Sequence, residues 1–131
     1  MNIYTSYFGK IKNFPKNFVT VAICGGIPDF YTGLWYRKVA PKWNFFCEWK
    51  KNHDNNFYIE HFNNEVLSKI TPQDFINDIK KLTNNAENVI LLCYEKPNEF
   101  CHRHLVANWI NNANMGINIE EWNLQKDKKQ D

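Results

Sequence analysis

Reactive side chains gather in one segment of this 131-residue chain, between residues 93 and 104. The segment holds two cysteines, two histidines, an arginine, a lysine and a glutamate: Cys93, Glu95, Lys96, Cys101, His102, Arg103 and His104. A buried strand is expected to end near Tyr94, Pro97 breaks it, and Asn98 can cap the helix that follows. Free backbone N–H groups and the dipole at the start of such a helix favour an anion. The segment is therefore typical of an anion-binding turn that carries a nucleophile.

The chemistry expected of this turn is that of a thiol. Cys101 is predicted to be the nucleophile or thiol donor, because a neighbouring imidazole and guanidinium promote the ionisation of a thiol. His102 and Glu95 are predicted to move protons. Arg103 is predicted to hold a phosphate or carboxylate with its planar guanidinium. Two further residues of the segment, Lys96 and Cys93, are expected to contact the same ligand.

Structural roles for the same residues remain open. Cys101 falls on one line of the expected helix with Leu105 and Trp109, and free cysteines are among the most buried residues of proteins. Glu95 fits an ion pair with Lys96 or Arg103 equally well. The crowding of a thiol, imidazoles and a guanidinium at a strand-end turn favours a site over these alternatives.

Two other segments carry polar groups that are expected to reach the same cleft. Cys24 and Gly25 follow a second apolar strand, and the backbone there can face an anion, although two glycines also fit a plain tight turn. Tyr4 and Ser6 lie on the first predicted strand. All four are predicted to contact the ligand.

No metal site and no cofactor are predicted, because the chain has no close CxxC or HxxxH pair. His102 and His104 are two residues apart, so in a regular helix they point roughly 200° apart and cannot share an ion. Cys101 and His104 are three apart and, with Cys93, keep zinc open as an alternative.

Aromatic residues are frequent between Phe30 and Trp49, and basic residues accompany them: Arg37, Lys38, Lys42, Lys50 and Lys51. Rings beside cations suit a nucleobase or a single strand of nucleic acid. Such rings more often cover the core, because apolar side chains usually lie inside.

The elements that must position these residues alternate along the chain. Strands are predicted over residues 3–8, 18–24, 89–94 and 117–122, and helices over 41–51, 55–70, 71–82 and 98–112. Thr71, Pro72 and Asp74 form a helix-start pattern. Buried strands that alternate with helices predict a single three-layer α/β domain with a mostly parallel sheet flanked by helices. Ligands bind such sheets beyond the carboxyl ends of the strands.

The length, composition and charge of the whole chain indicate its domain organisation and its location. We expect one domain over residues 1–124 and a charged, disordered tail over 125–131. No apolar run is long enough for a membrane span and no secretory signal opens the chain, so a cytoplasmic protein with reduced cysteines is expected. The net charge of +2 permits an anionic partner without requiring one.

The chain resembles the DUF488 family. The early match is Tyr4-Thr-Ser-Tyr-Phe-Gly; the late one is Leu91-Leu-Cys-Tyr-Glu-Lys with Cys101-His-Arg. A compact subgroup also shares Ile23-Cys-Gly, a Pro-Asp-Phe-Tyr turn, Ala40-Pro-Lys and Phe100-Cys-His-Arg-His-Leu-Val-Ala. The resemblance implies an α/β fold and a site at the late motif, but no particular reaction. Broader members tend to have Asp-x-Arg where this chain has Ala22-Ile23-Cys24, so any role of that Asp or Arg is absent here.

These observations favour an enzyme that acts on a small anionic, nucleotide-like ligand, although whether the chain is an enzyme at all stays open. The alternatives are a non-catalytic module that binds nucleic acid or nucleotides, and a zinc protein. Neither the substrate nor the oligomeric state follows from the sequence.

Overall fold

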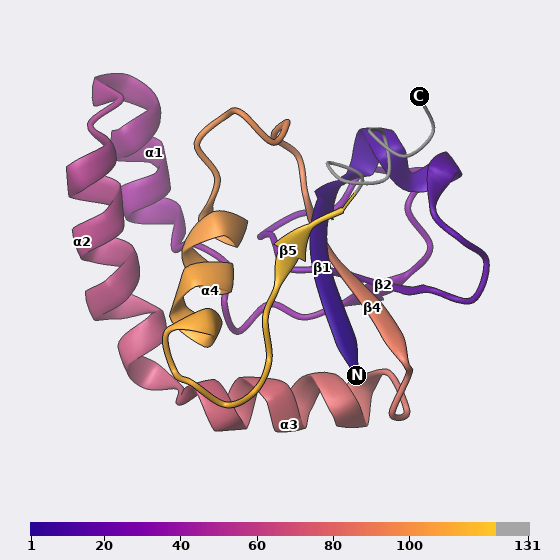
Figure 1. Cartoon of the computed structure of the whole chain (residues 1–131). Helices are drawn as coiled ribbons and strands as arrows, with labels where there is room; N and C mark the ends of the chain where they lie inside the picture. Colours follow the sequence, from indigo (N-terminus) through magenta and orange to yellow (C-terminus); the bar gives the residue numbers. More distant parts are fainter. Residues whose placement is uncertain (123–131) are drawn as a thin grey trace.

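The computed structural model describes residues 1–122, and its centre is a parallel five-stranded sheet in the order β3-β2-β4-β1-β5 (Figure 1). The strands are β1 (Asn2–Tyr7), β2 (Val19–Ala22), β3 (Leu34–Trp35), β4 (Asn88–Cys93) and β5 (Glu120–Glu121). The α-helices are α1 (Trp43–Asn52), α2 (Asn55–Glu65), α3 (Pro72–Leu82) and α4 (His102–Asn111). Two 3₁₀ helices, η1 (Phe8–Asn13) and η2 (Leu67–Lys69), complete the described elements. The predicted α/β fold with a parallel sheet is confirmed.

The two longest strands, β1 and the central β4, pair along their whole length, from Asn2 beside Asn88 to Tyr7 beside Cys93. Five of the six residues of β4 are buried. A parallel strand covered on both faces reads as a continuous apolar run, which is why residues 89–94 were recognisable as a strand.

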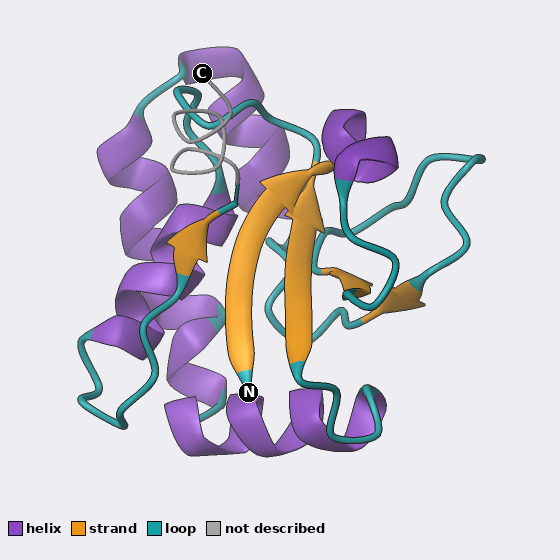
Figure 2. Cartoon of the chain, turned by 45° about the vertical axis from the view of Figure 1, so that its right-hand side comes forward, coloured by secondary structure: helices purple, strands orange, loops and turns teal. Residues whose placement is uncertain are grey.

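The two faces of the sheet are covered unequally (Figure 2). Side chains of alternate residues, such as Val89 and Leu91, join a large core with residues from all four α-helices. The intervening residues, such as Ile90 and Leu92, pack on the other face against η1 and the loops that flank β2. The α-helices lie on one side of the sheet, and η1 with mainly aromatic loop residues covers the other.

Helix α3 begins with the predicted pattern. The Thr71 hydroxyl accepts a hydrogen bond from the Asp74 backbone N–H, the Asp74 carboxylate accepts one from the Thr71 N–H, and Pro72 is the first helical residue. These contacts satisfy backbone donors that the helix itself leaves free.

Other boundaries differ from the predicted ones. The helix predicted over 55–70 is divided into α2 and η2, and the helix predicted over 98–112 begins only at His102. Strand β3 was not predicted, because two residues are too few to show an alternating pattern. The strand predicted over 117–122 is reduced to two residues beside β1.

The predicted tail, residues 125–131, lies outside the described part of the chain. Within residues 1–122, no helix combines the length and the apolar character that crossing a bilayer demands.

Candidate functional site

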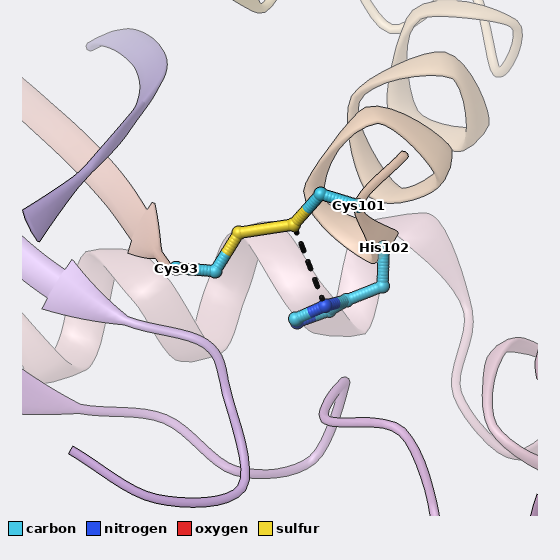
Figure 3. A group of neighbouring side chains, drawn as sticks. All are labelled: Cys93, Cys101 and His102. Carbon is cyan, nitrogen blue, oxygen red and sulfur yellow. Dashed lines mark hydrogen bonds between the residues drawn. A yellow bond between two sulfur atoms is a disulfide. The ribbon is translucent and has the colours of Figure 1, made fainter. Parts of the chain in front are cut away.

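The candidate site lies where β4 ends and α4 begins. Cys93 is the last residue of β4, and Cys101 is the residue that precedes the first turn of α4. The two cysteines are joined by a disulfide (Figure 3). The prediction of four reduced thiols is therefore corrected: in this structure only Cys24 and Cys47 are free. A spacing of eight residues does not indicate in the sequence that Cys93 and Cys101 pair. They meet because the chain turns back between the end of β4 and the start of α4.

His102 faces this pair of sulfurs (Figure 3). Its Nε2 lies 2.7 Å from the carbonyl oxygen of Ile23. A carbonyl can only accept, so Nε2 carries the proton and Nδ1 keeps its lone pair. Nδ1 is 3.8 Å from the Sγ atom of Cys101. Burial lowers the pKa of His102 to about 4, against the opposing effect of the Ile23 hydrogen bond. The ring is thus neutral near pH 7 and directs an acceptor nitrogen at the sulfur.

Neighbouring residues converge in this way because Cys101 is not helical. Its backbone is extended, with φ −154° and ψ 143°, whereas His102 is the first residue of α4. The sequence had placed Cys101 inside a helix that begins near Asn98. Residues one apart on a helix point about 100° apart, so only the later start of α4 lets the two side chains meet.

Arg103 has a different position from the expected one. Its side chain is completely buried, and its Nε and Nη2 atoms donate to the two carboxylate oxygens of Glu121 at 3.1 and 2.9 Å. Its Nη1 donates to the Glu95 carbonyl oxygen at 2.6 Å and to the Cys93 Sγ atom at 3.0 Å. We therefore revise its predicted role: the guanidinium is occupied by β5 and the turn after β4, and it does not line the cavity described next.

A cavity of about 650 Å³ opens beside the disulfide and lies between the turn after β4, the loop after β2 and helix α1. Cys93, Cys101 and His102 form part of its wall. Cys24, Gly25 and Gly26 line it as well, and a Cβ atom built on either glycine would meet nothing within 4 Å. Its size falls within the range of small-molecule sites, roughly 300–1,000 Å³.

Aromatic rings supply most of the remaining wall: Trp43, Phe46, Trp49, Tyr58, Tyr94 and Phe100. The predicted aromatic segment thus has two roles, because Phe45 is buried in the core while Trp43 remains 79% exposed beside the cavity. Rings around a small-molecule site offer their faces to a planar ligand.

The charges around the cavity come from Arg37, Lys42 and Glu95. Arg37 and Lys42 are exposed, and the Arg37 guanidinium carbon lies 4.9 Å from the centre of the Trp35 ring. The groups able to hold an anion here are therefore two cations from the loop before α1. Glu95 supplies the acidic side chain of the wall. Its predicted role in proton transfer requires a position on this wall.

Cys24 lines the cavity, but its environment keeps the thiol protonated. Its Sγ donates to the Gly26 carbonyl oxygen at 2.9 Å. Burial raises the pKa of Cys24 to about 11, and the negative charge of Glu95 adds to the increase. The thiolate is the reactive form of cysteine, so Cys24 is suited to contact a ligand rather than to attack it.

Three predicted ligand contacts are not brought to the cavity. The Tyr4 ring packs against Phe18 and Trp122 and is not part of the cavity wall. Ser6 is buried on β1, and its hydroxyl has no hydrogen-bond partner among the described residues. Lys96 is exposed on the turn, away from the cavity wall. These three positions remain predictions that the geometry does not support.

Sequence reasoning missed two groups of the site. Glu121 gave no signal, since one of two adjacent acidic residues close to a charged tail is typical of a surface position. Tyr58 and Phe100 fall in the segments predicted as helices over 55–70 and 98–112 and were not singled out, yet both line the cavity. Only the packing of α2 and the turn after β4 against α1 shows that these rings share a wall.

Comparison with known proteins identifies a family. The family model DUF488-N3a, described as "Active DUF488-N3 subclade", matches residues 10–114. That range contains the disulfide, His102, Arg103 and every residue of the cavity wall. No curated protein and no solved structure matches the chain.

Proposed function

The chain belongs to the DUF488-N3a family, the active DUF488-N3 subclade, and from this premise we propose that it is a thiol-dependent enzyme acting on a small anionic, nucleotide-like ligand. One observation carries the proposal: the lone pair of His102 Nδ1 is directed at the Cys101 sulfur, 3.8 Å away, on the wall of a cavity. A base held next to a nucleophile by a third group is the arrangement that activates thiols. Here the third group is the Ile23 carbonyl, which orients the ring.

The nucleophile exists only in the reduced protein. The disulfide must first accept two electrons from a thiol or phosphine reductant, with two protons from the thiols or from water. The Cys101 thiol then passes its proton to His102 as its sulfur bonds to an electrophilic carbon of the ligand; the group displaced from that carbon leaves with the electron pair of the broken bond and takes up the proton. Water then displaces the sulfur and regenerates the thiol. Glu95, on the same wall, is placed to exchange a proton with the ligand. Cys93 remains beside Cys101 and re-forms the disulfide under oxidising conditions.

The cavity supports the nucleotide-like character of the ligand. Arg37 and Lys42 offer positive charge for a phosphate, and the aromatic wall offers ring faces for a base. The volume of about 650 Å³ is sufficient for a nucleoside monophosphate. The anion is thus assigned to the loop before α1 rather than to Arg103.

The test is a turnover screen with reduced protein. Common ribonucleoside and deoxyribonucleoside monophosphates are incubated with the chain, and products and covalent adducts are measured by mass spectrometry. Conversion of at least one nucleotide, abolished in Cys101→Ser and retained in the control Cys47→Ser, is the expected result. Activity that survives Cys101→Ser with a native unfolding profile would exclude the thiol mechanism.

A second function has one observation in its favour. Trp43 is 79% exposed, and on the same helix Lys50 lies 5.3 Å from the Phe46 ring centre and 5.7 Å from that of Trp49. Exposed rings with adjacent cations bind single strands without base specificity. This alternative predicts that affinity for an oligonucleotide falls steeply with salt. Binding that ignores salt, or survives replacement of Lys42, Lys50 and Lys51, argues against it.

A further inference from the structure

We propose that, once the disulfide is reduced, Cys93, Cys101 and His102 form a binding site for a soft divalent metal ion, zinc in the first place, with its fourth position open to the cavity. The inference goes beyond the proposed reaction and does not depend on it, because it concerns metal binding by the chain alone. It also revises the ligand set considered from the sequence, in which His104 was the histidine.

The three donor atoms already lie together. The two Sγ atoms and a ring nitrogen of His102 are all within 4.8 Å of one another, and all three residues are buried. Tetrahedral zinc has bonds of about 2.3 Å to sulfur and about 2.0 Å to nitrogen, so neighbouring ligand atoms lie roughly 3.5–3.8 Å apart. The distance of 3.8 Å from Cys101 Sγ to His102 Nδ1 already meets this requirement.

The two sulfurs must separate when their bond is reduced, and the backbone allows it. The Cα atoms of Cys93 and Cys101 are 7.7 Å apart. This span is wide enough for the sulfurs to sit about 3.7 Å apart, as two thiolates on one zinc ion do. The strand and the helix can therefore keep their places.

The surroundings of the donors match those of metal ligands. A metal-binding histidine almost always donates its second ring N–H to a carbonyl or carboxylate, which orients the ring. His102 does so to the Ile23 carbonyl at 2.7 Å. Arg103 donates to the Cys93 sulfur at 3.0 Å, a contact that stabilises a thiolate. The paired carboxylate of Glu121 neutralises the arginine, so the guanidinium adds a hydrogen bond without net positive charge.

The site is open rather than closed. Within residues 1–122, no fourth cysteine, histidine or acidic residue joins the group, and all three donors line the cavity. Structural zinc sites use four protein ligands, whereas catalytic sites use three and leave the fourth position to water or substrate. The geometry therefore assigns the open type, in which an anionic ligand of the cavity can complete the metal shell.

The experiment uses the full chain, purified without a metal-affinity step, reduced with a phosphine and freed of metal. Cobalt(II) is added first, because tetrahedral thiolate sites give sulfur-to-cobalt charge-transfer and visible bands. Zinc is then titrated against a chromophoric chelator. We expect one equivalent of each metal in the wild-type chain and in the control Cys47→Ser. Cys93→Ser and Cys101→Ser should bind zinc about 100-fold more weakly or worse, since even orienting partners of ligands contribute 10–100-fold.

Several outcomes would overturn the proposal. They are the absence of thiolate bands in reduced wild-type protein, equal zinc affinity in all variants, and loss of binding in Cys47→Ser alone. The wild-type cobalt spectrum decides the matter even if a buried serine prevents folding. No substrate is present, so failure here leaves the proposed reaction standing. Metal binding without turnover of any nucleotide would instead reject the proposed reaction and retain the site.

Discussion

Arg103 either stabilises the fold or binds the ligand, and its replacement by methionine gives the sharpest test between these two roles. The guanidinium is completely buried and pairs with Glu121, whose side chain is only 8% exposed. Methionine preserves most of the apolar stem but leaves that carboxylate buried without its cationic partner; the Thr5 hydroxyl, which donates to Glu121 Oε1 at 2.7 Å, carries no charge. Removal of one member of a buried ion pair costs about 3–5 kcal/mol. The two hydrogen bonds to Glu95 and Cys93 are lost as well, which favours the upper part of that range.

The assay is urea unfolding followed by tryptophan fluorescence, with wild type and variants in the same redox state. For a chain of this length, the expected loss in the free energy of unfolding corresponds to a melting temperature lower by about 10–20 °C. The double variant Arg103→Met/Glu121→Gln should recover part of the loss, since it no longer buries an unpaired charge. The matched control is Arg37→Met on the cavity rim, which should stay within about 0.5 kcal/mol of wild type and lose affinity for nucleoside monophosphates.

The opposite results for Arg103→Met and Arg37→Met would refute the structural role of Arg103. If Arg103→Met unfolds within about 1 kcal/mol of wild type while nucleotide binding disappears, and Arg37→Met binds normally, the buried guanidinium is the anion site. The assignment of the anion to the loop before α1 would then be wrong.

Three further predictions concern other parts of the chain. Thr71→Ala removes the capping box of α3 and should lower the free energy of unfolding by about 1 kcal/mol; an unchanged urea midpoint would contradict it. Trp43→Ala, at an exposed ring, should leave stability within about 0.5 kcal/mol and weaken nucleotide binding; calorimetry that shows equal affinity would remove this ring from the site. Cys24, with its pKa raised to about 11 by burial, should resist iodoacetamide at pH 7 and react faster as the pH rises towards that value, because the thiolate fraction rises. Mass spectrometry that finds Cys24 modified before Cys47 at pH 7 would show that the Cys24 thiol is not suppressed.

The disulfide links the two proposals physically. The same sulfurs form the covalent bridge in the oxidised chain; the proposals would make them nucleophile and resolving thiol in the reaction, or metal ligands in the reduced chain. Only one of these states can exist at a time. A zinc ion bound at the site would occupy the Cys101 sulfur, so excess zinc should inhibit turnover and a chelator should restore it.

Local patterns in the sequence were enough to predict the elements that are long and buried. β4 is a continuous apolar run between turn signals, and Thr71 with Asp74 marks the start of α3, so both were predicted close to their observed bounds. Burial of consecutive residues and capping both leave a trace within a few positions of the chain. β3 and β5 have two residues each. They exist because a neighbouring strand offers hydrogen bonds, which no local pattern reports.

The sequence also determined which reactive groups gather, since Cys93, Cys101 and His102 do meet at the end of a central strand. The tertiary structure alone decided what each group can do. The carboxylate of Glu121, 18 residues from Arg103 along the chain, pairs with the guanidinium. The carbonyl of Ile23, 79 residues from His102, orients the imidazole. The roles of ionisable groups depend on burial and on partners within hydrogen-bonding distance, and contacts between residues far apart in the chain supply both.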